Sequence, residues 1–283
     1  MSRYGIKGLK YSFIMIFSII LMASKCSKED SVYRISTEFG DMYVKLYNST
    51  PVHKANFEKL VEEKFYDSLM FHRIIKDFMI QGGDPDSKNA PMGTVLGNGG
   101  PGYTLEAEII DTLFHKRGAL AAARLGDKQN PERKSSGSQF FIVHGKKFSK
   151  KELKQLAMNG TRYKQQQSQQ AFMSDSSNLW IPNGYKRCVE SGKKDSVLYF
   201  QKLWQSCLDS VKNTTEAVSF SEAQVKVYTT DGGSPHLDGD YTVFGELISG
   251  FEILDSIANT STDRRSRPME DIIFSIEKVK KVQ

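Results

Sequence analysis

Cysteine and tryptophan are scarce in this chain of 283 residues, which contains three cysteines and two tryptophans. Three cysteines are too few for the dense disulfide framework that replaces a hydrophobic core in small secreted proteins. Hydrophobic residues make up 39% of the chain, which is enough for at least one sizeable core. No cysteine cluster or paired histidine spacing suits a metal ion, so we predict no metal site; the five histidines are His53, His72, His115, His144 and His236.

A phosphate-binding motif is also absent. Residues 84–102 are rich in glycine, proline, asparagine and aspartate and include the run GTVLGNGGPG, which indicates a loop with several tight turns. This loop lacks the GxxxxGK[ST] pattern whose backbone amides cradle nucleotide phosphates. We therefore expect neither a nucleotide nor another cofactor.

Long apolar runs are confined to the N-terminus. Residues 13–23 form an uncharged, largely apolar run of 11 residues, and Arg3, Lys7 and Lys10 precede it. The run is too short to span a bilayer, which takes about 20 apolar residues. Basic residues followed by a short apolar stretch are typical of a secretory signal. We predict that residues 1–25 are a signal peptide and that the protein is exported.

Cys26 comes shortly after the apolar run. It resembles the lipidated cysteine of bacterial lipoproteins, and the Lys-Glu-Asp sequence at residues 28–30 resembles the charged export tag of surface lipoproteins in the Bacteroidetes. Lys25 departs from the small residue that usually precedes such a cysteine. The resemblance implies a lipidated tether at residues 26–30, which would hold the protein on the periplasmic face or the cell surface of the outer membrane without a transmembrane helix.

The most informative stretch is residues 71–84, FHRIIKDFMIQGGD. FHRII and FMIQ are short runs rich in bulky apolar residues, and a polar Lys-Asp break separates them, which predicts two adjacent strands. Because side chains alternate across a strand, Arg73, Met79 and Gln81 could converge on a mixed polar and apolar pocket. Taken alone, the pattern also fits a plain core with a surface arginine whose stem covers apolar neighbours.

The full string closely resembles the signature of the cyclophilins, a family of peptidyl-prolyl isomerases. Further similarity runs through GALAAAR at residues 118–124, GSQFFIV at residues 137–143 and HLDGDYTVFGEL at residues 236–247. A match of this length is poorly explained by chance.

The resemblance implies a closed, eight-stranded antiparallel β-barrel that is capped by two helices. It covers residues 31–145 and resumes at residue 235, so we assign the barrel to residues 31–145 and 235–283. Residues 146–234 are then an insertion. Local patterns agree with the barrel, because near alternation over residues 32–47 predicts a hairpin and Thr50 with Pro51 predicts the start of a helix.

The same resemblance implies the site residues. Arg73, Phe78 and Gln81 would be catalytic, with Arg73 as the donor to the proline nitrogen and Gln81 as a holder of the substrate backbone. The substrate-binding residues it implies are Met79, Ala123, Arg124, Phe141, Leu237 and Tyr241.

Peptidyl-prolyl isomerisation requires few functional groups from a protein. Rotation about an X-Pro bond meets a barrier of about 18 to 20 kcal/mol because amide resonance is lost at the twisted transition state. A catalyst therefore needs no nucleophile, metal or cofactor. It needs an apolar slot for the proline ring and a hydrogen-bond donor aimed at the nitrogen as its lone pair localises. Arginine suits this task because it stays charged and presents its donors in a rigid fork.

The insertion carries the basic excess of the chain, with 14 Lys plus Arg against 8 Asp plus Glu in residues 146–234. Ser149 with Glu152, and Ser219 with Glu222, have the spacing of a capping box, which predicts an α-helical hairpin or small bundle. Cys188 and Cys207 are disulfide candidates in an exported protein, although two free buried thiols are equally compatible with the sequence.

Three classes of function compete. The first is an exported peptidyl-prolyl isomerase, which would act as a monomer on proline-containing segments of exported proteins; the intact set around Arg73 favours it. The second is a binding or chaperone module on the same fold without significant isomerase activity. The third is a surface protein whose basic insertion contacts polyanions. It is the weakest, because the charges are spread along helices, and we expect no nucleic-acid partner.

Overall fold

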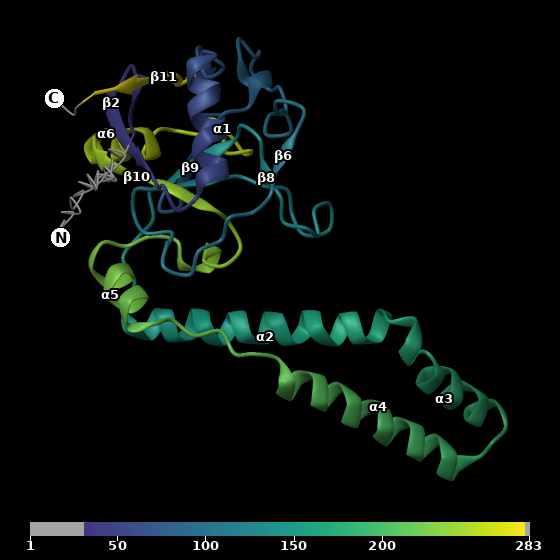
Figure 1. The fold of residues 1–283 in the computed structure, drawn as a ribbon. Coiled ribbons are helices and arrows are strands. Elements are labelled where there is room, and N and C mark those ends of the chain that lie inside the picture. The colour runs from purple at the N-terminus through teal and green to yellow at the C-terminus, as the bar shows by residue number, and fades with distance from the viewer. Residues whose placement is uncertain (1–30, 281–283) are drawn as a thin grey trace, which may run out of the picture.

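The protein is built on one large antiparallel sheet, from which a helical arm projects (Figure 1). The computed structural model describes residues 31–280, which contain eleven strands and six α-helices. In spatial order the nine strands of the main sheet are β3 (Leu69–Met70), β11 (Ile273–Val279), β1 (Val32–Thr37), β2 (Gly40–Leu46), β10 (Val243–Ser249), β7 (Ala119–Ala122), β9 (Phe140–Val143), β5 (Met79–Gly82) and β4 (Arg73–Ile75). Strands β6 (Thr104–Leu105) and β8 (Ser135–Ser136) form a separate pair.

The main sheet is a curled, open half-barrel, so the predicted closed barrel of eight strands is not confirmed. Strands β3 and β4 lie at the two ends of the sheet and are joined by Phe71 and His72 alone. They do not pair with each other within the described residues, because the backbone here is bonded to another segment. The amide of Phe71 donates to the carbonyl of Ile272 (3.0 Å), and that of Ile74 donates to the carbonyl of Ser266 (2.7 Å).

Side chains of the sheet alternate between two apolar clusters. Phe140 and Ile142 of β9 belong to the larger cluster, while Phe141 and Val143 belong to the smaller one. This follows from the two-residue period of a strand. The smaller cluster also contains Met79, and it is the one that underlies the candidate site.

Two helices, α1 (Pro51–Glu62) and α6 (Phe251–Ala258), contribute to the larger cluster. Pro51 occupies the start of α1 as predicted, but Thr50 makes no side-chain cap. The carboxylate of Glu108 accepts hydrogen bonds from the amides of Val52 (3.0 Å) and His53 (2.9 Å) instead. Glu108, which is distant in sequence, therefore accepts hydrogen bonds from free backbone amides of the first turn of α1. Its negative charge is also favourable at the positive end of the helix dipole.

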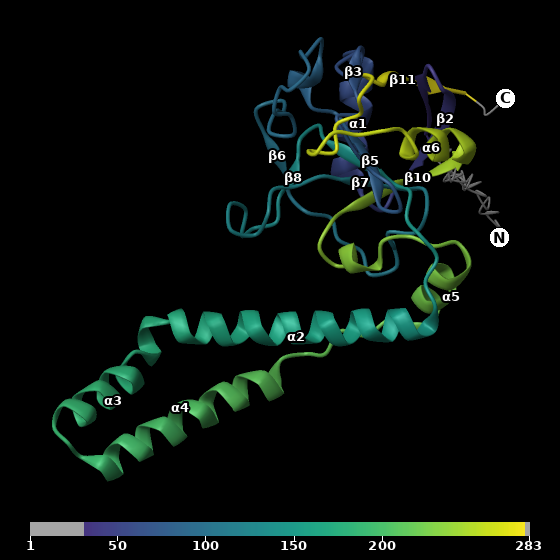
Figure 2. The same cartoon turned by 180° about the vertical axis from the view of Figure 1, so that it is seen from behind.

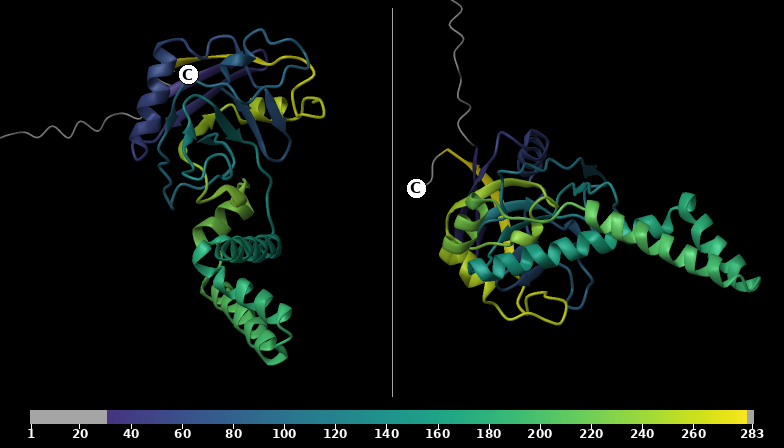
Figure 3. Two further views of the ribbon diagram at one scale, coloured as in Figure 1. Left: turned by 90° about the vertical axis from the view of Figure 1, so that its right-hand side faces the viewer. Right: turned by 90° about the horizontal axis from the view of Figure 1, so that it is seen from below.

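The helices between residues 146 and 234 form an arm and its base. Helices α2 (Lys150–Ser174), α3 (Trp180–Glu190) and α4 (Lys194–Thr214) extend away from the sheet, and α5 (Glu222–Thr230) lies between the arm and the sheet (Figure 2). Views from the side and from below show the same projection (Figure 3). Short 3₁₀ turns occur at η1 (Pro85–Ser87), η2 (Ser176–Asn178) and η3 (Pro235–Leu237).

The helix caps of the arm were partly predicted. The capping box of Ser149 and Glu152 at the start of α2 is confirmed. The box at Ser219 is wrong, because α5 begins two residues later, with Ser221 as cap and Gln224 as its partner. The preceding segment is held by a bond from the amide of Val218 to the hydroxyl of Thr161 on α2 (2.9 Å).

The two cysteines of the arm are both free thiols, so of the two alternatives that the sequence left open the structure has the unbridged one. Cys188 lies on α3 and Cys207 on α4. These helices pack through a different contact, in which Gly184 faces the ring of Phe200. A Cβ atom at position 184 would lie 2.4 Å from that ring.

A narrow neck of two chain segments joins the arm to the sheet. The amide of Gly233 donates to the carbonyl of Lys146 (3.0 Å), and that of Phe148 donates to the carbonyl of Tyr228 (2.9 Å). The segments approach so closely that a Cβ atom at Gly145 would lie 2.5 Å from the Cα atom of Gly233. The base of the arm is therefore fixed to the sheet through backbone contacts.

Among residues 31–280, no helix is long and apolar enough to cross a bilayer. The predicted signal peptide at residues 1–25 and the predicted lipidation at Cys26 lie outside the described residues.

Candidate active site

The pairing of β4 with β5 builds the polar edge of the site. Arg73 and Gln81 are direct partners across the two antiparallel strands, and Arg73 Nη1 donates a hydrogen bond to Gln81 Oε1 (3.1 Å). Asp77 adopts a left-handed backbone conformation, with φ of +61°, in the tight connection between the strands. The alternation predicted from residues 71–84 is thus confirmed for this pair.

Arg73 lies half-buried beside an aromatic ring. Its guanidinium carbon is 5.9 Å from the ring centre of Phe78. Burial lowers the pKa of Arg73 from its ordinary value, and the phenol of Tyr241 opposes this shift. No carboxylate in residues 31–280 forms an ion pair with Arg73. Its remaining donors are therefore not neutralised by an acidic neighbour.

These groups open onto a pocket of about 280 Å³. The structure brings all nine predicted site residues to its lining, namely Arg73, Phe78, Met79, Gln81, Ala123, Arg124, Phe141, Leu237 and Tyr241. Met79 is 1% exposed and Phe141 4% exposed, so these side chains of the apolar wall are almost fully buried. The pocket combines an apolar wall with a cationic donor at its edge.

Three further residues line this pocket and were not predicted. Leu96 and Gly97 come from the glycine-rich loop, whose course the sequence does not define. His72 directly precedes Arg73, the first residue of β4. Burial lowers the pKa of His72 to about 4, and its two ring nitrogens have no hydrogen-bond partner within the described part of the chain. His72 is therefore neutral at pH 7 and is not set up as a general base.

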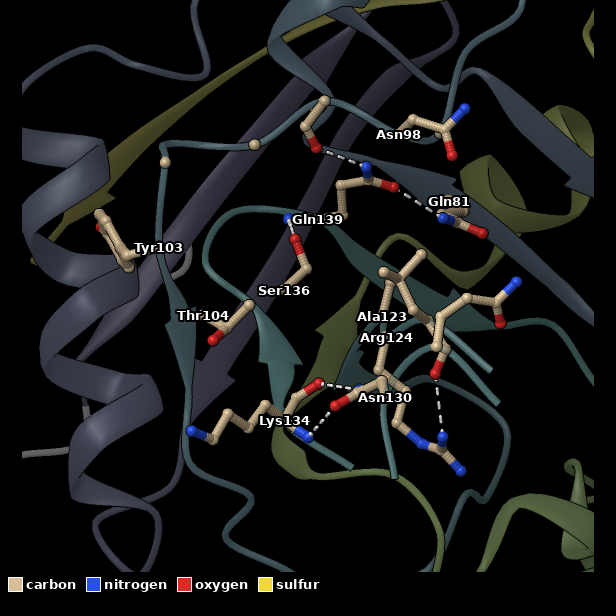
Figure 4. A pocket seen from close by; sticks show the side chains of 16 residues that line it. Gln81, Asn98, Tyr103, Thr104, Ala123, Arg124, Asn130, Lys134, Ser136 and Gln139 are labelled. Carbon is tan, nitrogen blue, oxygen red and sulfur yellow. Dashed lines mark hydrogen bonds between the residues drawn. The ribbon is translucent and has the colours of Figure 1, made fainter. Parts of the chain in front are cut away.

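A second pocket, of about 620 Å³, is drawn in Figure 4 and shares Gln81, Gly97, Ala123 and Arg124 with the first. Gln81 lies at the boundary, and its amide nitrogen donates to Gln139 Oε1 (3.0 Å). Gln139 in turn donates to the carbonyl of Gly99 in the glycine-rich loop (2.7 Å). The chain of bonds from Arg73 through both glutamines fixes the polar edge against that loop.

The guanidinium of Arg124 is bonded to neighbouring residues and is not a free cation in the pocket. Its Nε donates to the carbonyl of Asp240 (2.8 Å), and its Nη1 donates to Asp127 Oδ1 (2.6 Å). The guanidinium also lies 4.6 Å from the ring centre of Tyr241. The side chain thus closes the rim between the two pockets, and Figure 4 shows it folded back on its own loop.

His115 packs against two aromatic side chains that line the first pocket, Phe141 and Tyr241. Its imidazole stacks on Phe141 at 6.0 Å between ring centres and meets Tyr241 edge-on at 6.3 Å. No sequence pattern predicts this role, because His115 is distant in sequence from both rings. Residues 31–280 contain no group of three or more His, Cys, Asp and Glu residues placed to hold a metal ion.

Comparison with known proteins places the chain in a family. Residues 32–281 match the family of cyclophilin-type peptidyl-prolyl cis-trans isomerases. A Staphylococcus aureus protein named as a peptidyl-prolyl cis-trans isomerase is 30% identical over 242 residues, which are 84% of this chain and 86% of that protein.

A Streptococcus pyogenes protein named as a bifunctional phosphatase/peptidyl-prolyl cis-trans isomerase is 32% identical over 246 residues. The match takes in 85% of this chain but only 37% of the streptococcal protein. Among solved structures, a cyclophilin-type peptidyl-prolyl cis-trans isomerase of Cryptosporidium parvum aligns with a TM-score of 0.50 and 22% identity, over 89% of this chain and 99% of that one. This likeness bears on the fold alone.

The family match and the names of the relatives support isomerase activity, and the chain belongs to the cyclophilin-type peptidyl-prolyl cis-trans isomerases.

Proposed function

We propose that the pocket at Arg73 catalyses rotation about X-Pro bonds in extended segments of exported proteins. The observation that carries this proposal is the combination of an arginine without an acidic partner in the described chain and an apolar wall of largely buried side chains, both lining one pocket. A proline ring fits such a wall, and the preceding amide then lies beside the cationic edge.

Arg73 would act on the proline nitrogen. When the X-Pro bond twists, amide resonance is lost and the nitrogen lone pair localises. A guanidinium N–H aimed at that lone pair is stabilising only in the twisted state, which is the condition for lowering the barrier. The bond to Gln81 and the ring of Phe78 hold the guanidinium in place, so little reorganisation is needed.

The remaining site residues would bind substrate. Met79, Phe141 and Leu237 supply the apolar wall for the proline ring, with Tyr241 at its rim. Gln81 would hold the peptide backbone next to the proline. Ala123 and Arg124 lie at the boundary of the second pocket and would contact residues that precede the proline.

The place of action would be outside the cytoplasm. The basic and apolar pattern of residues 1–25 supports export, and Cys26 with the charged tag after it supports a lipid anchor. Extended X-Pro segments of other exported proteins, whose isomerisation takes tens of seconds, are the substrates expected there. We expect the protein to act as a monomer.

The test of activity is exchange NMR on a short X-Pro peptide. The protein should accelerate cis-trans exchange at concentrations far below that of the peptide. No acceleration of any X-Pro peptide would contradict the isomerase assignment. Mass spectrometry of the mature N-terminus tests the anchor, because an acylated Cys26 supports it and a free N-terminus elsewhere rules it out.

A second role, binding of unfolded clients, is favoured by one feature of the arm. Trp180 and Tyr199 are 54% and 59% exposed and lie near Phe200, with ring-centre distances of 6.3 Å and 5.4 Å to it. Exposed aromatic rings of this kind suit extended apolar chains. If this role exists, an Arg73→Ala variant should still delay aggregation of an unfolded protein, and a Trp180→Ala, Tyr199→Ala double variant should not.

A further inference from the structure

The last helix of the insertion, α5, contacts the sheet domain through a partly buried carboxylate, that of Asp238. Asp238 directly follows Leu237, which lines the pocket at Arg73. We call this pocket the proline pocket, after the ring that we propose it binds. The Oδ2 atom of Asp238 accepts hydrogen bonds from the hydroxyl of Tyr228 (2.6 Å) and from the amide of Gln224 (2.8 Å). Both donors belong to α5, and the Tyr228 side chain is fully buried. The insertion is therefore bonded to a residue next to the site.

The other oxygen of this carboxylate holds His115. Asp238 Oδ1 accepts from the backbone amide of His115 and from its ring Nδ1, each at 2.9 Å. A carboxylate oxygen only accepts, so the proton lies on Nδ1. The second ring nitrogen, Nε2, is buried and has no hydrogen-bond partner in the described part of the chain. Asp238 is thus the polar anchor that sets the orientation of the imidazole.

The charge of the carboxylate is maintained in place. Burial works against ionisation of Asp238, but the hydrogen bonds from His115 and Tyr228 outweigh it and lower its pKa. Burial and the neighbouring carboxylate raise the pKa of Tyr228, so its hydroxyl stays protonated and remains a donor. Hydrogen bonds to a charged acceptor are among the stronger ones in proteins.

His115 transmits this anchoring to the pocket wall by ring contact. Its imidazole is nearly parallel to Phe141, with an interplanar angle of 14°, and nearly perpendicular to Tyr241, with an angle of 84°. Both aromatic rings line the proline pocket. A tilt of the imidazole would therefore leave a gap behind the wall against which we propose the proline ring binds.

We propose that Tyr228 is a positioning residue for the isomerase site, which acts from the insertion through Asp238 and His115 on the Phe141 wall. This inference rests on the proposed function of the pocket and extends it, because it makes helix α5 part of the site's support. The distal arm, α2 to α4, is not needed for this role.

The test is a Tyr228→Phe variant of the full chain, which removes one hydroxyl and keeps the ring. The matched control is Tyr163→Phe, the same change at a residue of α2 that is 61% exposed. Since the wall contributes ground-state binding of the proline ring, we expect KM for an X-Pro peptide to rise on the order of threefold to tenfold, with a smaller change in kcat. The ¹⁵N signals of the His115 imidazole should move in Tyr228→Phe and stay in place in Tyr163→Phe.

Three outcomes decide the matter. Unchanged His115 signals, or moved signals with unchanged KM, overturn the inference. An Asp238→Asn variant serves as a second probe, and it should shift the same signals and raise KM at least as much. If the wild-type protein accelerates no X-Pro peptide, the proposed function fails. The inference is then tested by itself through the affinity for the peptide, measured by NMR titration, which needs no turnover. A weaker affinity in Tyr228→Phe but not in Tyr163→Phe would support it.

Discussion

Arg73 and Gln81 stand opposite each other on β4 and β5, and one of the guanidinium N–H groups of Arg73 bonds to the Gln81 side-chain oxygen at 3.1 Å. An arginine side chain has five such donors. The bond to Gln81 therefore orients the guanidinium of Arg73 and leaves its other N–H donors available. No carboxylate of the described chain forms an ion pair with this guanidinium. This relationship is the basis for the role that we assign to Arg73.

Truncation of the pocket wall should affect binding and stability together. Phe141 is 4% exposed and packs in the smaller apolar cluster. Phe141→Ala should lower the free energy of unfolding by roughly 3 to 5 kcal/mol and raise KM for an X-Pro peptide. Thermal or urea unfolding and exchange NMR measure the two effects.

Phe274→Ala is the matched control for this prediction. Phe274 is 1% exposed but belongs to the larger cluster. It should lose a similar amount of stability while KM stays close to the wild-type value at a temperature where the variant is folded. Equal changes of KM in both variants would show that the wall at Phe141 has no special part in binding.

Stability should depend on pH through His72. Burial lowers the pKa of His72 to about 4 from its ordinary 6.5. Between these values the unfolded chain binds a proton that the folded chain does not, so stability falls as pH decreases from 6.5 to 4 and is fully present above 6.5. A His72→Leu variant should show a shallower fall over this range in urea unfolding. The same slope in both proteins would be inconsistent with a buried, neutral His72.

We expect that the arm can be shortened without loss of the site. Thr161 and Val218 are joined by a hydrogen bond of 2.9 Å, so the two sides of the arm already meet there. Replacing residues 163–214 with a short Gly/Ser linker should leave a cooperative unfolding transition and nearly wild-type turnover of a small peptide. Circular dichroism during heating and exchange NMR provide the measurements.

A larger deletion should behave differently. A linker in place of residues 147–234, the extent suggested by the resemblance, would also remove Tyr228 and Leu153, which are buried. We expect this variant to be less stable and to have a higher KM than the shorter replacement. Equal behaviour of the two variants would mean that α5 does not support the barrel.

The sequence predicted what depends on local pattern. Alternation along the strands predicted that Arg73 and Gln81 converge, and serine at capping-box spacing located the start of α2 at Ser149. The same signal misplaced the start of α5, because Ser219 and Ser221 both have a suitable partner three residues later and only tertiary contacts choose between them.

Contacts between distant segments could not be predicted. The first turn of α1 is satisfied by Glu108, and the carboxylate of Asp238 joins His115 to Tyr228 across more than one hundred residues. The open sheet has the same origin. Whether β3 and β4 pair depends on the segment around Ser266 and Ile272, which takes up the backbone groups between them.

The most direct test of the account is the turnover of Arg73 variants, measured as cis-trans exchange of an X-Pro peptide by NMR, with thermal unfolding of each variant. Arg73→Ala should retain its fold and lose a factor of about 10² to 10³ in turnover, as expected for loss of one preorganised donor. Arg73→Lys should recover only part of the rate, because an ammonium on a flexible stem does not reproduce the guanidinium fork. A folded Arg73→Ala variant with wild-type turnover would contradict the central claim that Arg73 is the catalytic donor.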